Sequence, residues 1–150
     1  MAQVRVGIGC FLFNSHFHTI TGVRKGSIGA GTIALAGGHL ELGEEPEACA
    51  AREVLEETGI FIREGDVKFI TAVNSIFEAD QKQYITLFYG CRVPDDVKPE
   101  VLEPEKCEAW EWTSLETLTH LAHDPASNLF LPIRNLFHQR QGLDYPSYFK

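Results

Sequence analysis

The sequence lacks several features that define other classes of protein. No apolar run approaches the ~20 residues that a membrane-spanning helix needs, so we expect no membrane span. The first residues carry one arginine before a short apolar stretch and no small-residue cleavage site, which predicts a strand rather than a secretory signal. The four cysteines form no C-x-x-C pair and no zinc spacing, so we expect reduced thiols and a cytoplasmic or nuclear protein.

Positive charge is also scarce. Lysine and arginine number 13 against 21 acidic residues, which gives a formal net charge of −8. Binding to a long nucleic acid needs a basic surface, so this composition argues against it. A small phosphorylated ligand is still compatible, because a bound divalent cation reverses the local charge. With 44% hydrophobic and 23% charged residues, we expect residues 1–150 to form one globular domain.

The most informative stretch runs from Gly37 to Ile60 and reads GGHLELGEEPEACAAREVLEETGI. A glycine-rich turn comes first, and the second half predicts a helix with Pro46 in its first turn and Gly59 just past its end. At ~100° per residue, one face of this helix is apolar or small. We expect that face to be buried: Ala48, Ala51, Val54, Leu55 and Thr58.

Glu53, Glu56 and Glu57 lie on the opposite side of the predicted helix. Their i, i+3 and i+4 spacing puts the Cβ atoms roughly 5–6 Å apart, so the like charges repel, and Arg52 offers only one compensating charge. One interpretation is a solvated acidic face. The other is a site for a hard cation, because clustered carboxylate oxygens are what Mg²⁺ or Mn²⁺ prefers.

The residues in front of the helix favour the cation site. Together with the helix they fill all nine specified positions of the pattern G-x5-E-x7-R-E-U-x-E-E-x-G-U, where U is a bulky aliphatic residue. The matching residues are Gly38, Glu44, Arg52, Glu53, Val54, Glu56, Glu57, Gly59 and Ile60. The chain therefore resembles the Nudix hydrolase superfamily.

Other stretches resemble one branch of that superfamily, the MutT-like and thiopurine-nucleotide-hydrolysing nucleoside triphosphate diphosphatases. They are Arg24–Gly31, Gly37–Glu41, Val73–Ser75, Tyr84–Thr86, Glu103–Lys106 and Trp110–Trp112. The resemblance extends from about Val4 to Arg140 and has two departures. Relatives usually have proline in place of Ala36, and they tend to have tryptophan in place of Leu131, which cannot stack as an indole does.

The resemblance implies roles for particular residues. Magnesium, with manganese as the alternative, would lie on Glu53 and Glu57, with Glu56 assisting and the Gly37 carbonyl as a further ligand. Arg52 and Glu44 would hold those carboxylates. The remaining implied contacts are with substrate: Arg24, Gly38 and His39 with phosphate, and Thr86, Phe130 and Leu131 with the base. A homodimer is implied as well.

The order of elements predicts an α/β protein, and the resemblance implies the same architecture: an α/β/α sandwich on a mixed sheet. We expect a last helix over residues 128–139, kinked or restarted at Pro132. The loop from Arg24 to Gly31 suits phosphate contact, although an ordinary solvated loop has the same composition. The expected strands are Val4–Phe13, Thr19–Arg24, Thr32–Ala36, Val67–Phe77, Tyr84–Val93 and Cys107–Thr113.

The expected activity is Mg²⁺-dependent hydrolysis of nucleoside triphosphates, modified purine nucleotides among them, to a monophosphate and pyrophosphate. The general base would be Glu53, Glu56 or an acidic residue between Glu100 and Glu108, and Glu105 is the candidate for an extra metal ligand. One alternative keeps the chemistry with another diphosphate, such as an isoprenyl diphosphate. The other is a non-catalytic binding module, which the retained carboxylates disfavour.

Overall fold

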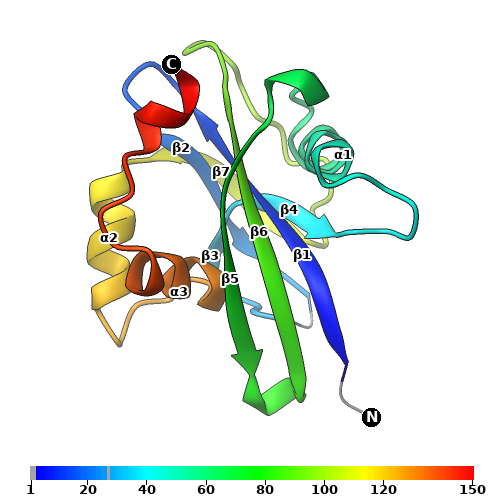
Figure 1. Ribbon diagram of the computed structural model, residues 1–150, viewed down its shortest axis with the longest axis vertical. Coiled ribbons are helices and arrows are strands. Elements are labelled where there is room, and N and C mark those ends of the chain that lie inside the picture. The colour runs from blue at the N-terminus through cyan, green and yellow to red at the C-terminus, as the bar shows by residue number, and fades with distance from the viewer. Residues whose placement is uncertain (1–2, 27) are drawn as a thin grey trace.

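The computed structural model describes residues 3–26 and 28–150 (Figure 1). Ser27, part of the loop predicted to contact phosphate, lies outside the described residues. The strands are β1 (Val4–Phe13), β2 (Thr19–Arg24), β3 (Ile33–Ala34), β4 (Ala36–His39), β5 (Lys68–Phe77), β6 (Lys82–Arg92) and β7 (Cys107–Thr113). The helices are α1 (Pro46–Thr58), α2 (Leu115–His123) and α3 (Leu131–Gln139), with short 3-10 helices at Glu64–Asp66, Glu78–Asp80 and Tyr145–Phe149.

Strand β1 is the centre of a mixed sheet. One of its edges pairs in parallel with β6 from Val4 to Phe13, and β6 continues the sheet to β5 in the antiparallel direction. Its other edge is divided between two strands. Residues 7–10 pair with β4, whereas Phe13 pairs with the start of β2. Because β2 then pairs with β3 and β7, the sheet forks along this edge of β1.

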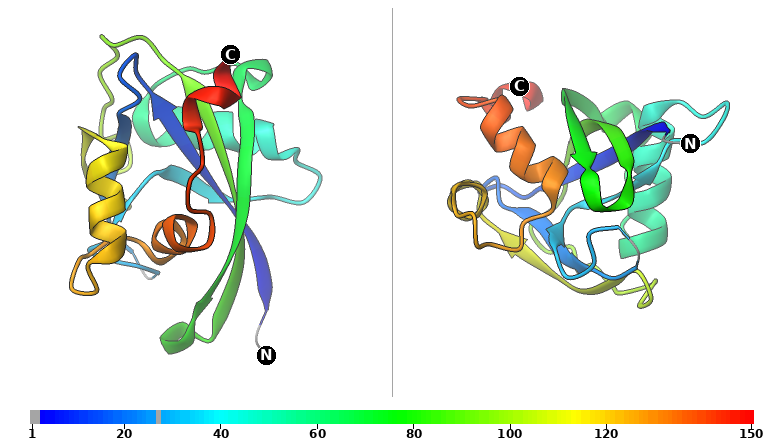
Figure 2. Two further views of the ribbon diagram at one scale, coloured as in Figure 1. Left: turned by 60° about the vertical axis from the view of Figure 1, so that its left-hand side comes forward. Right: turned by 90° about the horizontal axis from the view of Figure 1, so that it is seen from below.

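Helices cover both faces of the sheet, as the α/β/α prediction requires. Helix α1 lies on one side, and α2 and α3 lie together on the other (Figures 1 and 2). Each layer has its own apolar core: Val54 belongs to the α1 side, and Leu118 and Leu136 belong to the other. No helix in residues 3–26 and 28–150 is long and apolar enough to cross a membrane.

Helix α1 begins and ends where the sequence predicts. Pro46 occupies the first turn, and Gly59 adopts a left-handed φ of 76° while its N–H bonds the Leu55 carbonyl. The predicted buried face is wrong at Leu55, whose side chain is exposed. The helix is rotated toward Glu53, so its buried residues are Cys49, Ala50, Glu53, Val54 and Thr58.

The ends of β5 and β6 differ by one or two residues from the predicted strands, and two other elements differ more. The strand expected over Thr32–Ala36 is two strands, β3 and β4, which meet at Leu35. Helix α3 starts at Leu131 rather than at residue 128 and has no internal kink, because Pro132 lies in its first turn. Leu129 instead bridges to Ile33 of β3, which keeps the segment before the helix extended.

Candidate active site

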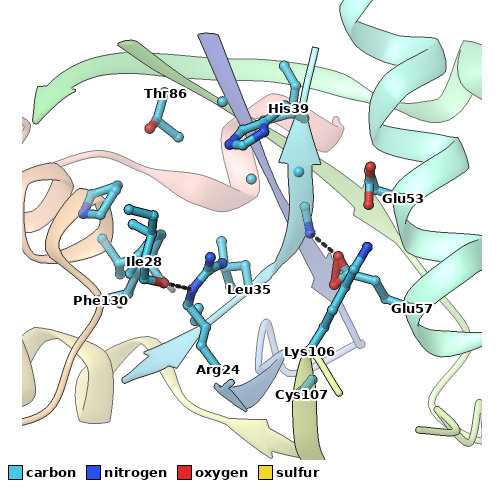
Figure 3. Close-up of a pocket in the computed structure, with 18 of the residues that line it drawn as sticks. Arg24, Ile28, Leu35, His39, Glu53, Glu57, Thr86, Lys106, Cys107 and Phe130 are labelled. Carbon is cyan, nitrogen blue, oxygen red and sulfur yellow. Dashed lines mark hydrogen bonds between the residues drawn. The ribbon is translucent and has the colours of Figure 1, made fainter. Parts of the chain in front are cut away.

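A cavity of about 540 Å³ opens between the sheet, α1, the β2–β3 loop and the start of α3. The carboxylates of Glu53 and Glu57 lie at one side of this cavity, and Phe130 and Ile28 lie at the opposite side (Figure 3). The fork in the sheet accounts for the opening, because β2 and β4 separate along the edge of β1 that they share. Residues distant in the sequence therefore line one chamber.

The glycine turn brings the backbone of β4 against the two carboxylates. A Cβ atom at Gly38 would overlap the Glu53 carboxylate, and one at Gly37 would overlap the Ile8 carbonyl of β1, so neither position has room for a side chain. The Gly37 N–H donates to Glu57 Oε1 at 3.3 Å. Gly38 thus allows α1 to pack directly on β4 with the Glu53 side chain buried, and Gly37 allows β4 to pack closely on β1.

Arg52 connects the carboxylates of this region. Its Nε and Nη2 donate to the two oxygens of Glu44 at 2.7 and 3.1 Å, a bidentate pair. Its Nη1 donates to Glu53 Oε1 at 2.8 Å and more weakly to Glu56 Oε2 at 3.4 Å. The hydrogen bonds from Arg52 lower the pKa of Glu44 to about 2. Arg52 and Glu44 therefore hold Glu53 in one orientation, although neither lines the cavity.

Glu53 and Glu57 are poorly compensated. Burial, followed by the charge of Glu53, raises the pKa of Glu57 to about 8, while the Gly37 N–H acts in the opposite direction. Burial also raises the pKa of Glu53, and Arg52 opposes that shift. Two oxygen donors with excess negative charge fit a hard divalent cation. Glu56 is exposed and lies outside the cavity lining, and the described residues present no ready group of three His, Cys, Asp or Glu side chains for an ion.

A third carboxylate approaches this pair from the loop before β7. Glu103 Oε1 is buried without a hydrogen-bond partner among the described residues, and its Oε2 lies 3.4 Å from Lys106 Nζ. The Glu103 charge contributes to the raised pKa of Glu57. Glu105, the residue chosen from the sequence as an extra ligand, is exposed and outside the cavity lining. No spacing in the sequence distinguishes Glu103 from Glu105.

The loop is held in place by the end of α1. The Glu57 carbonyl accepts hydrogen bonds from Leu102 N at 3.5 Å and from Trp110 Nε1 at 3.3 Å. These two hydrogen bonds hold the loop against the end of α1, and Glu103, the next residue after Leu102, therefore lies near Glu57.

Positive charge gathers around the same cavity. Arg24 and His39 line it as the resemblance implies, and Lys25 and Lys106 line it too. The Lys25 N–H donates to the Lys106 carbonyl at 2.7 Å, which joins the β2–β3 loop to the loop before β7. His39 Nε2 lies 3.1 Å from the Tyr84 hydroxyl, and partial burial followed by the nearby arginines lowers the pKa of His39. Lys106 and Tyr84 were not assigned from the sequence.

The far end of the cavity is mainly apolar. Thr86 and Phe130 line it, together with Phe77, Phe88 and Ile133. Leu131 does not: the lining passes from Phe130 to Pro132 and Ile133. Helix α3 begins at Leu131, and residues three apart on a helix share a side, so Phe130 and Ile133 face the cavity together.

The forked sheet brings buried carboxylates and cationic side chains to one cavity. This combination is typical of an enzyme that uses a divalent cation to act on small phosphorylated compounds. The model of the NUDIX domain family matches residues 3–132, so the chain belongs to that family. This membership supports pyrophosphohydrolase activity in general.

Solved structures agree with that assignment. A MutT NUDIX hydrolase from Burkholderia pseudomallei is 28% identical, with a TM-score of 0.68 over 77% of this chain and 86% of that one. A MutT protein from Methanosarcina mazei Go1 is 21% identical, with a TM-score of 0.74 over 92% and 93%. A bifunctional NMN adenylyltransferase/ADP ribose pyrophosphatase from Francisella tularensis, complexed with AMP and a manganese ion, is 19% identical, with a TM-score of 0.64 over 80% and 37%.

The raised pKa of Glu57 predicts how stability depends on pH. Without a divalent cation, the free energy of unfolding should fall by on the order of a few kcal/mol as pH rises from about 5 to about 8, because the folded state retains a proton that the unfolded chain has released. Glu57→Gln should flatten this fall, and saturating Mg²⁺ should oppose it in the parent. Urea unfolding curves across this pH range, in EDTA or Mg²⁺, measure the free energy of unfolding. If that free energy changes with pH equally in the parent and in Glu57→Gln, the prediction is wrong.

The Arg52 network predicts a second outcome. Arg52→Lys keeps the charge but loses the bidentate contact with Glu44, so the Glu53 carboxylate should lose its fixed orientation. Residues that orient metal ligands typically contribute 10–100-fold, and we expect kcat/KM to fall by roughly that factor. Arg63→Lys is the matched control, because Arg63 forms an exposed pair with Asp66 at 3.2 Å. Equal kinetics for the two variants would show that Arg52 has no such role.

Proposed function

We propose that this protein hydrolyses nucleoside triphosphates, modified purine nucleotides among them, to a monophosphate and pyrophosphate with Mg²⁺, or alternatively Mn²⁺. The observation that carries the proposal is a single cavity with two chemically different ends (Figure 3). Buried carboxylates at one end, within reach of the charges of Arg24 and Lys106, suit a metal-bound diphosphate. Aromatic and aliphatic walls around the Thr86 hydroxyl at the other end suit a nucleobase.

Each group of the chain has a task in this reaction. Glu53, Glu57 and the Gly37 carbonyl would hold the cation, which when bound neutralises phosphate charge and lowers the pKa of a water. Arg24, His39 and Lys106 would contact the non-bridging phosphate oxygens. A carboxylate accepts the proton of the attacking water as the new P–O bond forms. The bond between the α-phosphorus and the bridging oxygen then breaks, and that oxygen leaves with pyrophosphate.

The base that takes this proton is not assigned to one residue. Glu53, Glu56 and the acidic residues between 100 and 108 are the candidates from sequence. Two structural facts rank them. Glu53 lines the cavity, whereas Glu56 and Glu103 both lie outside its lining. Glu103 does keep a buried oxygen without a partner in the described part of the chain, so Glu53 is the first candidate and Glu103 the second.

The apolar wall supports a second substrate class. Ile28, Leu35, Phe88 and Ile133 line the cavity and offer the contacts that an isoprenyl chain needs. The Thr86 hydroxyl favours the nucleotide, since Thr86 lines the cavity and no hydrogen bond from its hydroxyl is formed within the described residues. A polar group held in an apolar wall selects a ligand that can pair with it. A non-catalytic binding module is disfavoured, because the carboxylates are present and buried together.

A substrate panel tests the proposal. Nucleoside triphosphates, modified purine triphosphates, ADP-ribose and an isoprenyl diphosphate should be assayed with Mg²⁺, with Mn²⁺ and with EDTA. We expect a triphosphate to have the highest kcat/KM, pyrophosphate to be released, and activity to vanish in EDTA. Glu57→Gln should reduce turnover by on the order of a hundredfold or more, because it removes a metal ligand. Turnover of this variant within threefold of the parent would remove the metal assignment.

Thr86→Val separates the two substrate classes. It removes the hydroxyl at nearly constant volume, so kcat/KM for the preferred nucleotide should fall roughly three- to tenfold, the value of one neutral hydrogen bond. Isoprenyl diphosphate hydrolysis should be unchanged or improved. Steady-state kinetics with one substrate of each class suffice. Equal losses for both would place Thr86 away from the base.

The homodimer belongs to the same proposal. Light scattering after size exclusion should give twice the chain mass of 16.8 kDa. A monomer at micromolar concentration would remove it.

A further inference from the structure

The ring of Phe130 is covered by other groups of the protein. The Arg24 guanidinium lies over it, with Cζ 4.3 Å from the ring centroid. Phe77 packs at a centroid distance of 5.8 Å and an angle of 38°. At the ring edge, a Cβ atom on Gly29 would come within 2.6 Å of Cε1, so the loop leaves room only for glycine there. A ring so enclosed is a poor stacking platform for a substrate base.

Two contacts hold the Arg24 side chain, and its two Nη groups are left without a hydrogen bond to the described residues. Its Nε donates to the Ile28 carbonyl at 3.0 Å, and its planar group rests on the Phe130 ring (Figure 3). Neither Nη nitrogen has a hydrogen-bond partner among the described residues, and neither is a buried unpaired atom, so both face the open cavity. These are the donors that bind a phosphate in bidentate fashion.

The ring is fixed independently of Arg24. Phe130 N donates to the Ile33 carbonyl at 2.9 Å, and Ile33 N donates to the Asn128 carbonyl at 2.8 Å. Phe130 is also the residue from which α3 begins. The backbone therefore sets the ring position. The long side chain of Arg24 has several rotatable bonds and would sample other orientations without the ring beneath it.

We propose that Phe130 is a positioning residue for Arg24. It presents the two Nη groups to the substrate phosphates, and it does not select the base. The proposal rests on the proposed function only in requiring a diphosphate substrate. If Phe130 acts only through Arg24, its effect on binding is the same for every substrate that contains the diphosphate. The rest of the substrate does not change that effect. Base selection then falls to the other cavity walls, with Thr86 among them.

The test compares Phe130→Leu, which removes the ring, with Phe130→Tyr, which keeps it. Phe17→Leu is the matched control, because Phe17 carries Arg92 at 4.7 Å from its ring centroid and does not line the cavity. Two quantities are measured: the dissociation constant of magnesium pyrophosphate by calorimetry, and KM and kcat for a purine and a pyrimidine triphosphate. The pyrophosphate measurement needs no nucleotide turnover, so a failure of the proposed substrate is distinguishable from a failure of this proposal.

For Phe130→Leu we expect the dissociation constant and both KM values to rise by the same factor, roughly three- to tenfold, with kcat changed by less than about twofold. Phe130→Tyr should recover most of the loss, and Phe17→Leu should change neither quantity. In an Arg24→Ala background, Phe130→Leu should add less than about twofold, because the two residues act as one unit.

Two results would overturn the proposal. A loss confined to the purine substrate would make Phe130 a base platform. A full effect of Phe130→Leu in the Arg24→Ala background would show that the ring does not act through Arg24. If Phe130→Leu lowers the melting temperature enough to unfold the protein, Phe130→Met removes the ring with less loss of volume, and the same comparisons decide.

Discussion

The repulsion between two buried carboxylates is the constraint around which this structure is arranged. Glu53 and Glu57 project from one helix into a cavity, and burial makes their joint ionisation unfavourable. Arg52 divides its hydrogen bonds among Glu44, Glu53 and Glu56, and the charges of Lys106 and Arg24 act on Glu53 and Glu57 respectively. The remaining negative charge is what a divalent cation and an anionic substrate together can balance. Without a cation, the raised pKa lets Glu57 keep a proton near neutral pH, and that proton relieves the repulsion.

The backbone of β4 allows the two carboxylates to lie against the sheet. Gly38 leaves no side chain between the strand and α1, and Gly37 leaves none between the strand and β1, so the Gly37 N–H can bond Glu57. The loop before β7 closes the same region from the other side through the Glu57 carbonyl. Three segments distant in sequence therefore meet at the end of α1. The loop and β7 bond the Glu57 backbone carbonyl, whereas Gly37 bonds one oxygen of its carboxylate.

How much the sequence could reveal depended on whether a feature was local. Helix α1, its proline start and its glycine end followed from local rules, and the box residues followed from fixed spacing. The failures came from tertiary contacts. Leu55 is exposed because Glu53 occupies the inner face in its place, and Glu103 rather than Glu105 meets Glu57 because the loop is anchored at Leu102 and Trp110. No spacing rule predicts that Leu129 pairs with Ile33 and so delays the start of α3.

The fork in the sheet has an evolutionary consequence. One edge of β1 pairs with β4 at residues 7–10 and with β2 at Phe13, whereas β6 and β5 continue the sheet from the other edge, so the metal end and the far wall are built on different segments. Side chains of the far wall come from β5, from β6, from the β2–β3 loop and from the start of α3. Mutations there can reshape what is recognised while the hydrolytic end stays intact. Such an architecture allows one chemistry to be inherited while its targets diversify.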